Sequence, residues 1–344
     1  MIKVFLIDDS VIVRQGFKKI FAEVKDIEVI GEADNPVDAF AEFKKVGLPD
    51  LFILDIEMPK MDGLTFLKKI TEQRPTPVII CSTLVTDGSS ALIDAMRFGA
   101  ADVVAKPKIN LNKFFGEYKQ ELLDKVRAVA NSKVSCNSKV STRGSIAKTS
   151  PRPSMPSAQM VAIGSSTGGV QVLEEIITHL KPNHQGIMIV QHMPQGFTAS
   201  FAKRLNDISP NSEVLEAKEG DIIMNGRVLI APGDKHMEIK KDGLKYRVAL
   251  KDYPRVNSHK PSVNVLMSSV SKEVKGNATG FILTGMGDDG ASGLKQMKDA
   301  GSKTYAQNEQ TATVYGMPKM AVQLGATDTT LSIFDITKTI NNLK

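Results

Sequence analysis

The first 130 residues alternate short apolar runs with helical patterns, and no other feature restricts the fold as strongly. The apolar runs lie at 3–7, 27–33, 51–54, 77–81 and 102–105. Helical periods follow near 11–23, 36–45, 63–73, 89–98 and 112–129. Because each strand precedes a helix, the pattern predicts a parallel sheet covered on both faces, an α/β unit of (βα)5 type.

The same alternation returns in the second half of the chain. Strand-like runs lie at 160–163, 187–191, 228–230 and 279–283. Helical stretches follow near 170–180, 196–206, 262–274 and 291–299. Residues 237–250 alternate around Asp242-Gly243, which indicates a hairpin. We therefore expect a second α/β domain with a mostly parallel, doubly wound sheet and at least one antiparallel addition.

A segment of different composition separates the two patterns. Residues 131–158 contain eight Ser, three Pro, five basic residues and no acidic residue. So polar a segment buries too little apolar surface to offset the entropy of ordering it. It predicts a flexible linker between domains. We expect a first domain at 1–125, a terminal helix end and linker at 126–158, and a second domain at 159–344.

Charge and composition exclude several classes of protein. The 344 residues include 44 basic and 38 acidic ones, a net charge of +6, and such a balance is typical of nucleic-acid binding. Five basic residues lie in the linker, so 39 remain against 38 acidic ones, and we expect no nucleic-acid partner. No apolar run approaches the roughly 18–20 residues of a membrane span, and the N-terminus lacks a signal-peptide pattern. Cys81 and Cys136 have no metal-site or disulfide-framework spacing. Because span, signal-peptide and disulfide patterns are all lacking, we expect a cytoplasmic protein without membrane insertion.

Three aspartates follow predicted strands of the first domain. Asp8 and Asp9 end the first strand, and Asp55 ends the third. Carboxyl ends of parallel strands meet at one sheet edge, so the three carboxylates should lie close together. Their repulsion calls for a cation, and all-oxygen ligation suits Mg²⁺. The alternative is that Asp8 and Asp9 only cap the first helix.

Two further polar side chains should reach the same edge. Ser82 ends the fourth strand, and Lys106-Pro107 closes the fifth. A lysine there can pair with a carboxylate or with phosphate oxygens, and a hydroxyl can donate to a phosphoryl oxygen.

This arrangement, which spans residues 1–125, resembles the receiver domain of two-component response regulators, a flavodoxin-like fold. The resemblance implies that Asp55 accepts a phosphoryl group, that the three carboxylates hold Mg²⁺, and that Ser82 and Lys106 contact the phosphoryl group. Receivers usually carry an aromatic switch residue three positions before the lysine, where this chain has Val103. That difference puts signalling through an aromatic rotamer in doubt, but not phosphorylation.

A glycine-rich turn follows the first strand of the second domain. The sequence Gly164-Ser165-Ser166-Thr167-Gly168-Gly169 contains Gly-x-Ser-x-Gly between a strand and a helix. That frame fits a nucleophile elbow that exposes Ser166, with helix N–H groups available for an oxyanion. A glycine-rich anion-binding loop is the alternative.

A nucleophilic serine needs a base, and the chain has five histidines. His192 directly follows the strand IMIVQ and should reach the same sheet edge as Ser166. His179 and His184 have the pattern of exposed turn residues, and two loop histidines are weaker candidates, His236 and His259.

The third group should be a carboxylate that orients the imidazole. Asp288 and Asp289, in the run TGMGDDG after another apolar strand, are both suitable by position, and both could instead be helix caps. The resulting Ser, His, Asp order differs from that of α/β-hydrolases, so that fold is not implied.

The runs GSSTGG, VQHMP and LTGMGDDGASG resemble the catalytic domain of chemotaxis protein-glutamate methylesterases over residues 159–344. The order receiver, linker, esterase is specific to that family. The resemblance assigns nucleophile, base and carboxylate, respectively, to Ser166, His192 and Asp289. It also implies that Thr167 helps to orient the base and that the backbone N–H of Met286 serves the oxyanion hole. Lys260 stands where relatives usually have arginine, so its contact with a substrate would be looser.

The family implies a phosphorylation-activated enzyme that hydrolyses glutamyl methyl esters on chemoreceptor helices, releases methanol and deamidates receptor glutamines. Its partners would be those cytoplasmic helices and a chemotaxis histidine kinase as phosphodonor. We expect a monomer, no cofactor in the esterase site, and an unphosphorylated receiver that blocks that site. Two alternatives stay open: a DNA-binding response regulator, and a phosphate sink or adaptor whose Ser166 loop only binds an anion.

Overall fold

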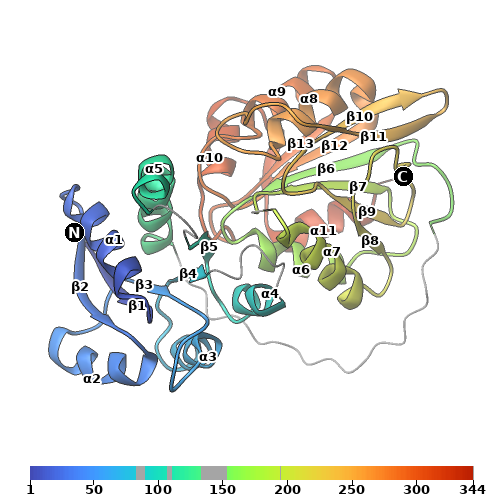
Figure 1. Cartoon of the computed structure of the whole chain (residues 1–344). Helices are drawn as coiled ribbons and strands as arrows, with labels where there is room; N and C mark the ends of the chain where they lie inside the picture. Colours follow the sequence, from blue (N-terminus) through green and yellow to red (C-terminus); the bar gives the residue numbers. More distant parts are fainter. Residues whose placement is uncertain (83–89, 107–110, 133–152, 194, 344) are drawn as a thin grey trace. The chain divides into compact units, whose positions relative to one another are not determined.

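A computed structural model describes residues 1–82, 90–106, 111–132, 153–193 and 195–343 (Figure 1). The chain divides into two compact units, 1–140 and 141–344. Each unit is described by itself.

The first unit contains a parallel sheet with the order β2-β1-β3-β4-β5. Its strands are β1 (Ile2–Ile7), β2 (Ile27–Ala33), β3 (Leu51–Leu54), β4 (Val78–Ser82) and β5 (Asp102–Ala105). Its helices are α1 (Val11–Ala22), α2 (Pro36–Val46), α3 (Gly63–Gln73), α4 (Ser90–Arg97) and α5 (Leu111–Ala130). The predicted (βα)5 order is therefore confirmed, and the strand order is the flavodoxin-like one.

Local capping explains where the first helices begin. The side chains of Ser10, Asn35 and Asp62 each accept a hydrogen bond from a backbone N–H in the first turn of the following helix. The cap of α1 is thus Ser10, and the alternative that Asp8 and Asp9 serve only as caps is wrong. These two residues instead lie at the carboxyl end of β1, where the strand order reverses between β1 and β3.

The second unit is built on a seven-stranded sheet with the order β14-β13-β12-β6-β7-β9-β8, and its described pairs are parallel. The strands are β6 (Met160–Ser165), β7 (Gly186–Gln191), β8 (Glu213–Glu216), β9 (Arg227–Ile230), β12 (Ala278–Ile282), β13 (Lys303–Gln307) and β14 (Thr329–Leu331). The order reverses at β6, so the crevice beyond its carboxyl end is the expected ligand site.

Helices cover both faces of this sheet, which confirms the doubly wound prediction. Figure 1 shows α8 (Val263–Glu273), α9 (Ala291–Asp299) and α10 (Met317–Gln323) on one face. The other face carries α6 (Gly169–Thr178), α7 (Phe197–Ile208) and α11 (Ile333–Asn341).

The predicted hairpin is present as β10 (His236–Asp242) and β11 (Lys245–Lys251), which pair antiparallel. It forms a two-stranded sheet of its own and does not join the main sheet. The hairpin packs on α8, where the Ile239 amide donates to Ser269 Oγ at 2.9 Å.

The expected linker ends earlier than residue 158. Pro156 bridges Met224, and Ser157 is buried, with its Oγ accepting the Gly186 amide at 3.0 Å. A polar segment can pack in this way when its polar groups find partners. Residues 133–152 of the expected linker lie outside the described residues.

The described helices include none with both the length and the apolar composition that crossing a bilayer requires.

Candidate functional site

The acidic cluster of the first unit forms at the reversal of strand order. Ligand oxygens of Asp8, Asp9 and Asp55 all lie within 4.8 Å of one another. Asp8 and Asp55 are buried, whereas Asp9 is exposed. Lys106 Nζ lies 2.5 Å from Asp55 Oδ2, 2.9 Å from Asp8 Oδ2 and 3.9 Å from Asp9 Oδ1. Four of the five predicted residues therefore meet at one edge.

Burial perturbs the titration of this cluster. Desolvation raises the pKa of Asp55 to about 6, although the hydrogen bond and charge of Lys106 act in the opposite direction. Desolvation also raises the pKa of Asp8. One lysine thus faces three carboxylates whose charged forms are costly to bury. The donors are all oxygen, which is the ligand set that Mg²⁺ prefers, so the residues fit that ion.

Other residues near this cluster complete its frame. Ser82 is buried at the end of β4, and its carbonyl accepts the Lys106 amide at 3.0 Å. Val103 lies in β5 opposite Ile80. Sequence reasoning missed Arg14, whose guanidinium donates to the Asp8 carbonyl at 2.5 Å and so anchors the backbone of the cluster.

In the second unit, strand register brings the predicted serine and histidine together. Ser165 of β6 pairs with Gln191 of β7, and the His192 amide donates to the Ser165 carbonyl at 3.0 Å. Ser166 and His192 are the next residues of these adjacent strands, so they emerge side by side at the carboxyl edge.

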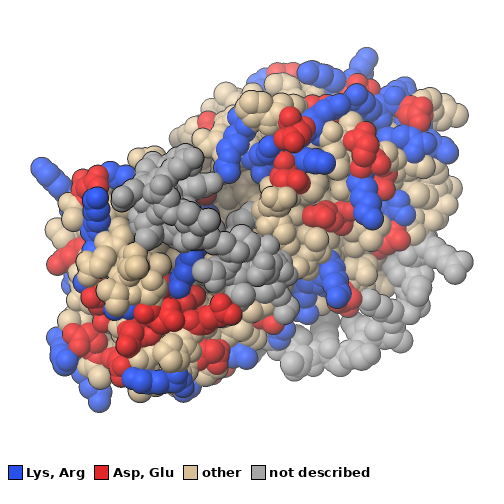
Figure 2. All heavy atoms as spheres, viewed as in Figure 1, with Lys and Arg blue, Asp and Glu red and all other residues tan. Residues whose placement is uncertain are grey.

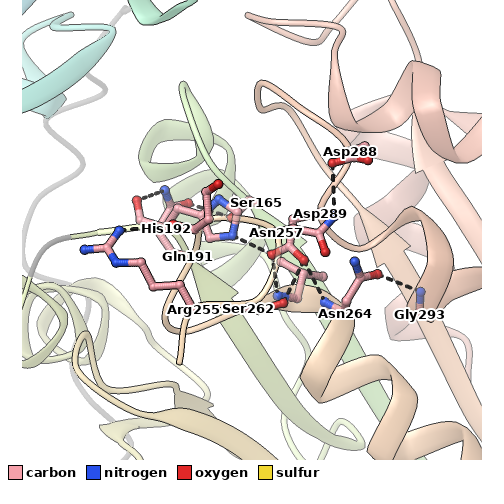
Figure 3. Close-up of polar contacts among 12 residues, drawn as sticks. Ser165, Gln191, His192, Arg255, Asn257, Ser262, Asn264, Asp288, Asp289 and Gly293 are labelled. Atoms are coloured by element: carbon pink, nitrogen blue, oxygen red, sulfur yellow. Dashed lines mark hydrogen bonds and ion pairs between the residues drawn. The ribbon is translucent and has the colours of Figure 1, made fainter. Parts of the chain in front are cut away.

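The two consecutive serines have different environments. The Ser165 side chain is buried and donates to Gln191 Oε1 at 2.6 Å (Figure 3). Ser166 is only partly buried, and its carbonyl accepts Gln191 Nε2 at 2.9 Å. A Cβ at Gly169 would come within 2.1 Å of Gln191 Oε1, so a glycine is needed there. Ser165 and Gln191 thus support the turn that presents Ser166.

His192 is held at one ring nitrogen. Its Nε2 lies 2.8 Å from Asp289 Oδ2 (Figure 3). The other nitrogen, Nδ1, is buried and has no hydrogen-bond partner among the described residues. Since a carboxylate only accepts, Nε2 carries the proton and Nδ1 presents its lone pair.

The Asp289 carboxylate lies against the start of helix α8. It accepts hydrogen bonds from Ser262 Oγ at 2.7 Å and from the amides of Val263 and Asn264 at 2.7 and 3.1 Å. Burial favours the neutral acid, but the bonds from His192, Ser262 and Val263 outweigh it and hold the pKa of Asp289 below its ordinary value. These amides are the unpaired donors of a helix N-terminus, which also favours negative charge.

The neighbouring Asp288 is exposed and accepts Asn257 Nδ2 at 3.1 Å. Between the two open candidates, Asp289 is therefore the one that reaches inward. Gly290 is the N-cap of α9, so the interpretation of both aspartates as side-chain caps of that helix is wrong.

The two residues implied only by family resemblance lie in adjoining loops. Thr167 is buried, and its carbonyl accepts Thr284 Oγ1 at 2.9 Å. Met286 follows Gly285, where an added Cβ would lie 2.7 Å from Ser166 Cβ. The loop after β12 therefore passes directly beside the serine.

The remaining histidines have only in part the surroundings that the sequence predicted. His179 is exposed, as expected, but His184 is buried and its Nε2 lies 2.7 Å from Ser212 Oγ. His236 is also buried, and His259 stacks on the His192 ring. The prediction that His184 is exposed is wrong because a turn histidine with partners for both nitrogens packs well.

The fold and the two sites define a class: a response regulator whose receiver is followed by an α/β output domain with an enzyme-like site at its switch point. Residues 161–340 match the CheB methylesterase family, and residues 4–114 match the response regulator receiver domain. This chain belongs to the CheB methylesterase family.

Relatives agree over nearly the whole length. The chain is 45% identical over 342 residues to protein-glutamate methylesterase/protein-glutamine glutaminase 3 of Leptospira interrogans, covering 98% of both. It is 46% identical over 352 residues to protein-glutamate methylesterase/protein-glutamine glutaminase 1 of Pseudomonas savastanoi pv. phaseolicola, covering 98% of both. The crystal structure of the Thermotoga maritima CheB methylesterase catalytic domain is 37% identical, with a TM-score of 0.53, covering 54% of this chain and 98% of that one.

Proposed function

We propose that this protein is a phosphorylation-activated protein-glutamate methylesterase and protein-glutamine glutaminase that acts on chemoreceptor helices in the cytoplasm. The observation that carries the proposal is the His192–Asp289 hydrogen bond of 2.8 Å, which leaves the second imidazole nitrogen without a partner on a residue that emerges next to Ser166 at the strand ends. That arrangement suits a general base next to a nucleophile.

Ser166 attacks the side-chain carbonyl of a glutamyl methyl ester, while His192 Nδ1 takes the hydroxyl proton. The same imidazolium then protonates the departing methoxide, so methanol leaves and an acyl-enzyme forms. Water, deprotonated by His192, attacks that acyl group and releases glutamate and free Ser166. On a glutamine the first step releases ammonia instead, so ester hydrolysis and deamidation share one route.

Asp289 has an electrostatic role in these steps. Because its pKa is held low, it stays ionised while His192 becomes positively charged. Backbone N–H groups stabilise the negative charge of the tetrahedral intermediate, and we propose the Met286 N–H as one of these donors. Thr167, buried beside the serine, helps to orient the base.

In the receiver we propose Asp55 as the phosphoryl acceptor and a chemotaxis histidine kinase as the donor. Asp8, Asp9 and Asp55 would hold Mg²⁺, whose charge would offset that of the incoming phosphoryl group. Lys106 and Ser82 are then placed to contact the phosphoryl oxygens.

The decisive experiment compares Ser166→Ala with Ser165→Ala in a methanol-release assay on methylated receptor. We expect Ser166→Ala to lose about 10⁴-fold or more in kcat, because it removes the nucleophile. Ser165→Ala should stay within about tenfold in kcat, since the hydrogen bond that it deletes supports the fold and its cost of roughly 1–3 kcal/mol should fall on stability. Retained activity in Ser166→Ala would refute the mechanism and favour the anion-loop alternative.

The DNA-binding alternative finds little support. A single helix-turn-helix is far smaller than the seven-stranded output unit. On the face shown in Figure 2, lysines and arginines are interspersed with acidic side chains. We expect no salt-dependent shift of duplex DNA on a gel.

A further inference from the structure

The ring of His259 lies flat on the ring of His192. Their centroids are 3.7 Å apart, and the planes differ by 10°. The proposed proton relay uses only the edge of the His192 ring, where Nε2 meets Asp289 and Nδ1 is buried without a hydrogen-bond partner among the described residues. His259 therefore contacts a part of the base that the relay leaves unused.

A tight turn presents His259 to this position. Val256 and His259 exchange both backbone hydrogen bonds, at 3.0 and 2.9 Å. The two residues between them, Asn257 and Ser258, have φ values of 48° and 66°. Two left-handed residues in a two-residue turn are typical of type I′, a rigid geometry that is uncommon for serine.

The tip of this turn is attached to the loop of the catalytic carboxylate. Asn257 Nδ2 donates to Asp288 Oδ1 at 3.1 Å, and Asp288 adjoins Asp289 (Figure 3). Arg255 also donates to the Ser258 carbonyl at 3.0 Å. The turn and the carboxylate loop are thereby held together.

The two ends of the segment are held by a buried histidine. His236 Nε2 donates to the Pro254 carbonyl at 3.1 Å, and its Nδ1 accepts the Ser262 amide at 3.2 Å. Lys260 is engaged as well, 2.8 Å from Asp252. Residues 254–262 thus form a frame fixed at both ends, with His259 at its inner side.

We propose that His259 is a positioning residue that fixes the plane of the His192 imidazole. This inference rests on the proposed function and deepens it. The hydrogen bond to Asp289 fixes one ring atom but leaves the ring free to tilt about it. A flat ring against the face removes that freedom, so Nδ1 stays aimed at Ser166.

His259 is not a second base in this arrangement. The lone pairs of an imidazole lie in the ring plane, and two stacked rings direct them in parallel planes. No proton passes between the rings in this geometry, so the contribution of His259 is orientation and exclusion of water from the ring face.

The test uses three variants of the full chain: His259→Phe, His259→Ala and His259→Leu. Phenylalanine keeps a flat ring, leucine fills the space without one, and alanine empties it. We expect the alanine and leucine variants to lose about 10- to 100-fold in kcat with KM within about twofold, the size of effect that small misplacement produces. The phenylalanine variant should recover to within about threefold of wild type.

Three results would overturn the proposal: unchanged kcat in the leucine and alanine variants, a phenylalanine variant as slow as they are, or a loss confined to KM. Circular dichroism checks that each variant is folded, and the leucine variant decides the question where alanine does not fold. Failure of the proposed function is a different result, since it appears as activity retained by Ser166→Ala.

Discussion

A single buried carboxylate shows how much of the site depends on individual hydrogen bonds. Asp289 is 1% exposed, yet its pKa is held below the ordinary value because the imidazole, a hydroxyl and helix amides donate to it. The negative charge of Asp289, which would stabilise a His192 imidazolium, is thus maintained by these hydrogen-bond donors. Deleting one donor should therefore make the ionised carboxylate less favourable.

Ser262→Ala tests this dependence. Loss of the 2.7 Å bond to Oδ1 should raise the pKa of Asp289 and lower kcat by about 10- to 100-fold, because a hydrogen bond to a charged group is worth roughly 1.5–3 kcal/mol. The control is Ser271→Ala, on the same helix, whose hydroxyl donates to the Ser268 carbonyl. Methanol release should be slowed in Ser262→Ala only. Equal rates in the two variants would contradict the dependence of Asp289 on the Ser262 hydrogen bond.

His184 makes stability depend on pH. Burial lowers its pKa from the ordinary 6.5, so the unfolded chain binds a proton more readily than the folded one. The free energy of unfolding should therefore fall as the pH drops below about 6.5, until the lowered folded-state pKa is passed. In His184→Gln this contribution is absent.

The measurement is urea unfolding of residues 153–344 at several values between about pH 7.5 and 5, followed by circular dichroism. We expect the stability advantage of wild type over His184→Gln to shrink towards acid. An advantage that is constant or grows towards acid would show that His184 is not held neutral.

At the scale of elements, the site depends on loops that pass close to one another. A Cβ at Gly285 would lie 2.4 Å from Met317 Sδ and 2.7 Å from Ser166 Cβ. Gly285→Ala must therefore displace the serine turn, and we expect a loss of at least about 100-fold in kcat from misplacement. At Gly276 the nearest atom would be 3.3 Å away, so Gly276→Ala should keep near-normal methanol release.

The elements that sequence patterns predicted are those with a strong period or a continuous apolar run. Central strands such as β6 and β7 are buried along their whole length, and the sequence shows this directly. The patterns missed β8, β13 and β14, and also α10 and α11. Short strands with polar residues, such as Thr329–Leu331, carry little signal of their own and form because a neighbouring strand is already in place.

The candidate site divides in the same way. Ser166, His192 and the pair Asp288-Asp289 each follow an apolar strand, so topology predicted that they reach one edge, whereas only the family resemblance chose Asp289 over Asp288. Ser262 was assigned no role and His259 was only a weaker candidate for the base, because their contacts depend on a turn and a helix start that pack against residues distant in sequence. Local sequence patterns do not show which residues far apart in the sequence come into contact.

At the scale of the whole molecule, we expect the charge of Asp55 to connect the receiver to its output. Lys106 pairs with that carboxylate at 2.5 Å in the unphosphorylated protein. A phosphoryl group would add about two negative charges there, so Lys106 and the end of β5 would have to readjust. We expect this local change to raise the esterase rate of the full chain.

The size of the effect is limited by free energy. Shifting an inhibited population from about 1% to 99% active needs about 5.5 kcal/mol, and partial activation needs less. We expect acetyl phosphate with Mg²⁺ to accelerate methanol release by the full chain, but not by Asp55→Asn. Residues 153–344 alone should be insensitive to the phosphodonor, because they lack the acceptor. Acceleration of that fragment, or of Asp55→Asn, would place the control outside the receiver.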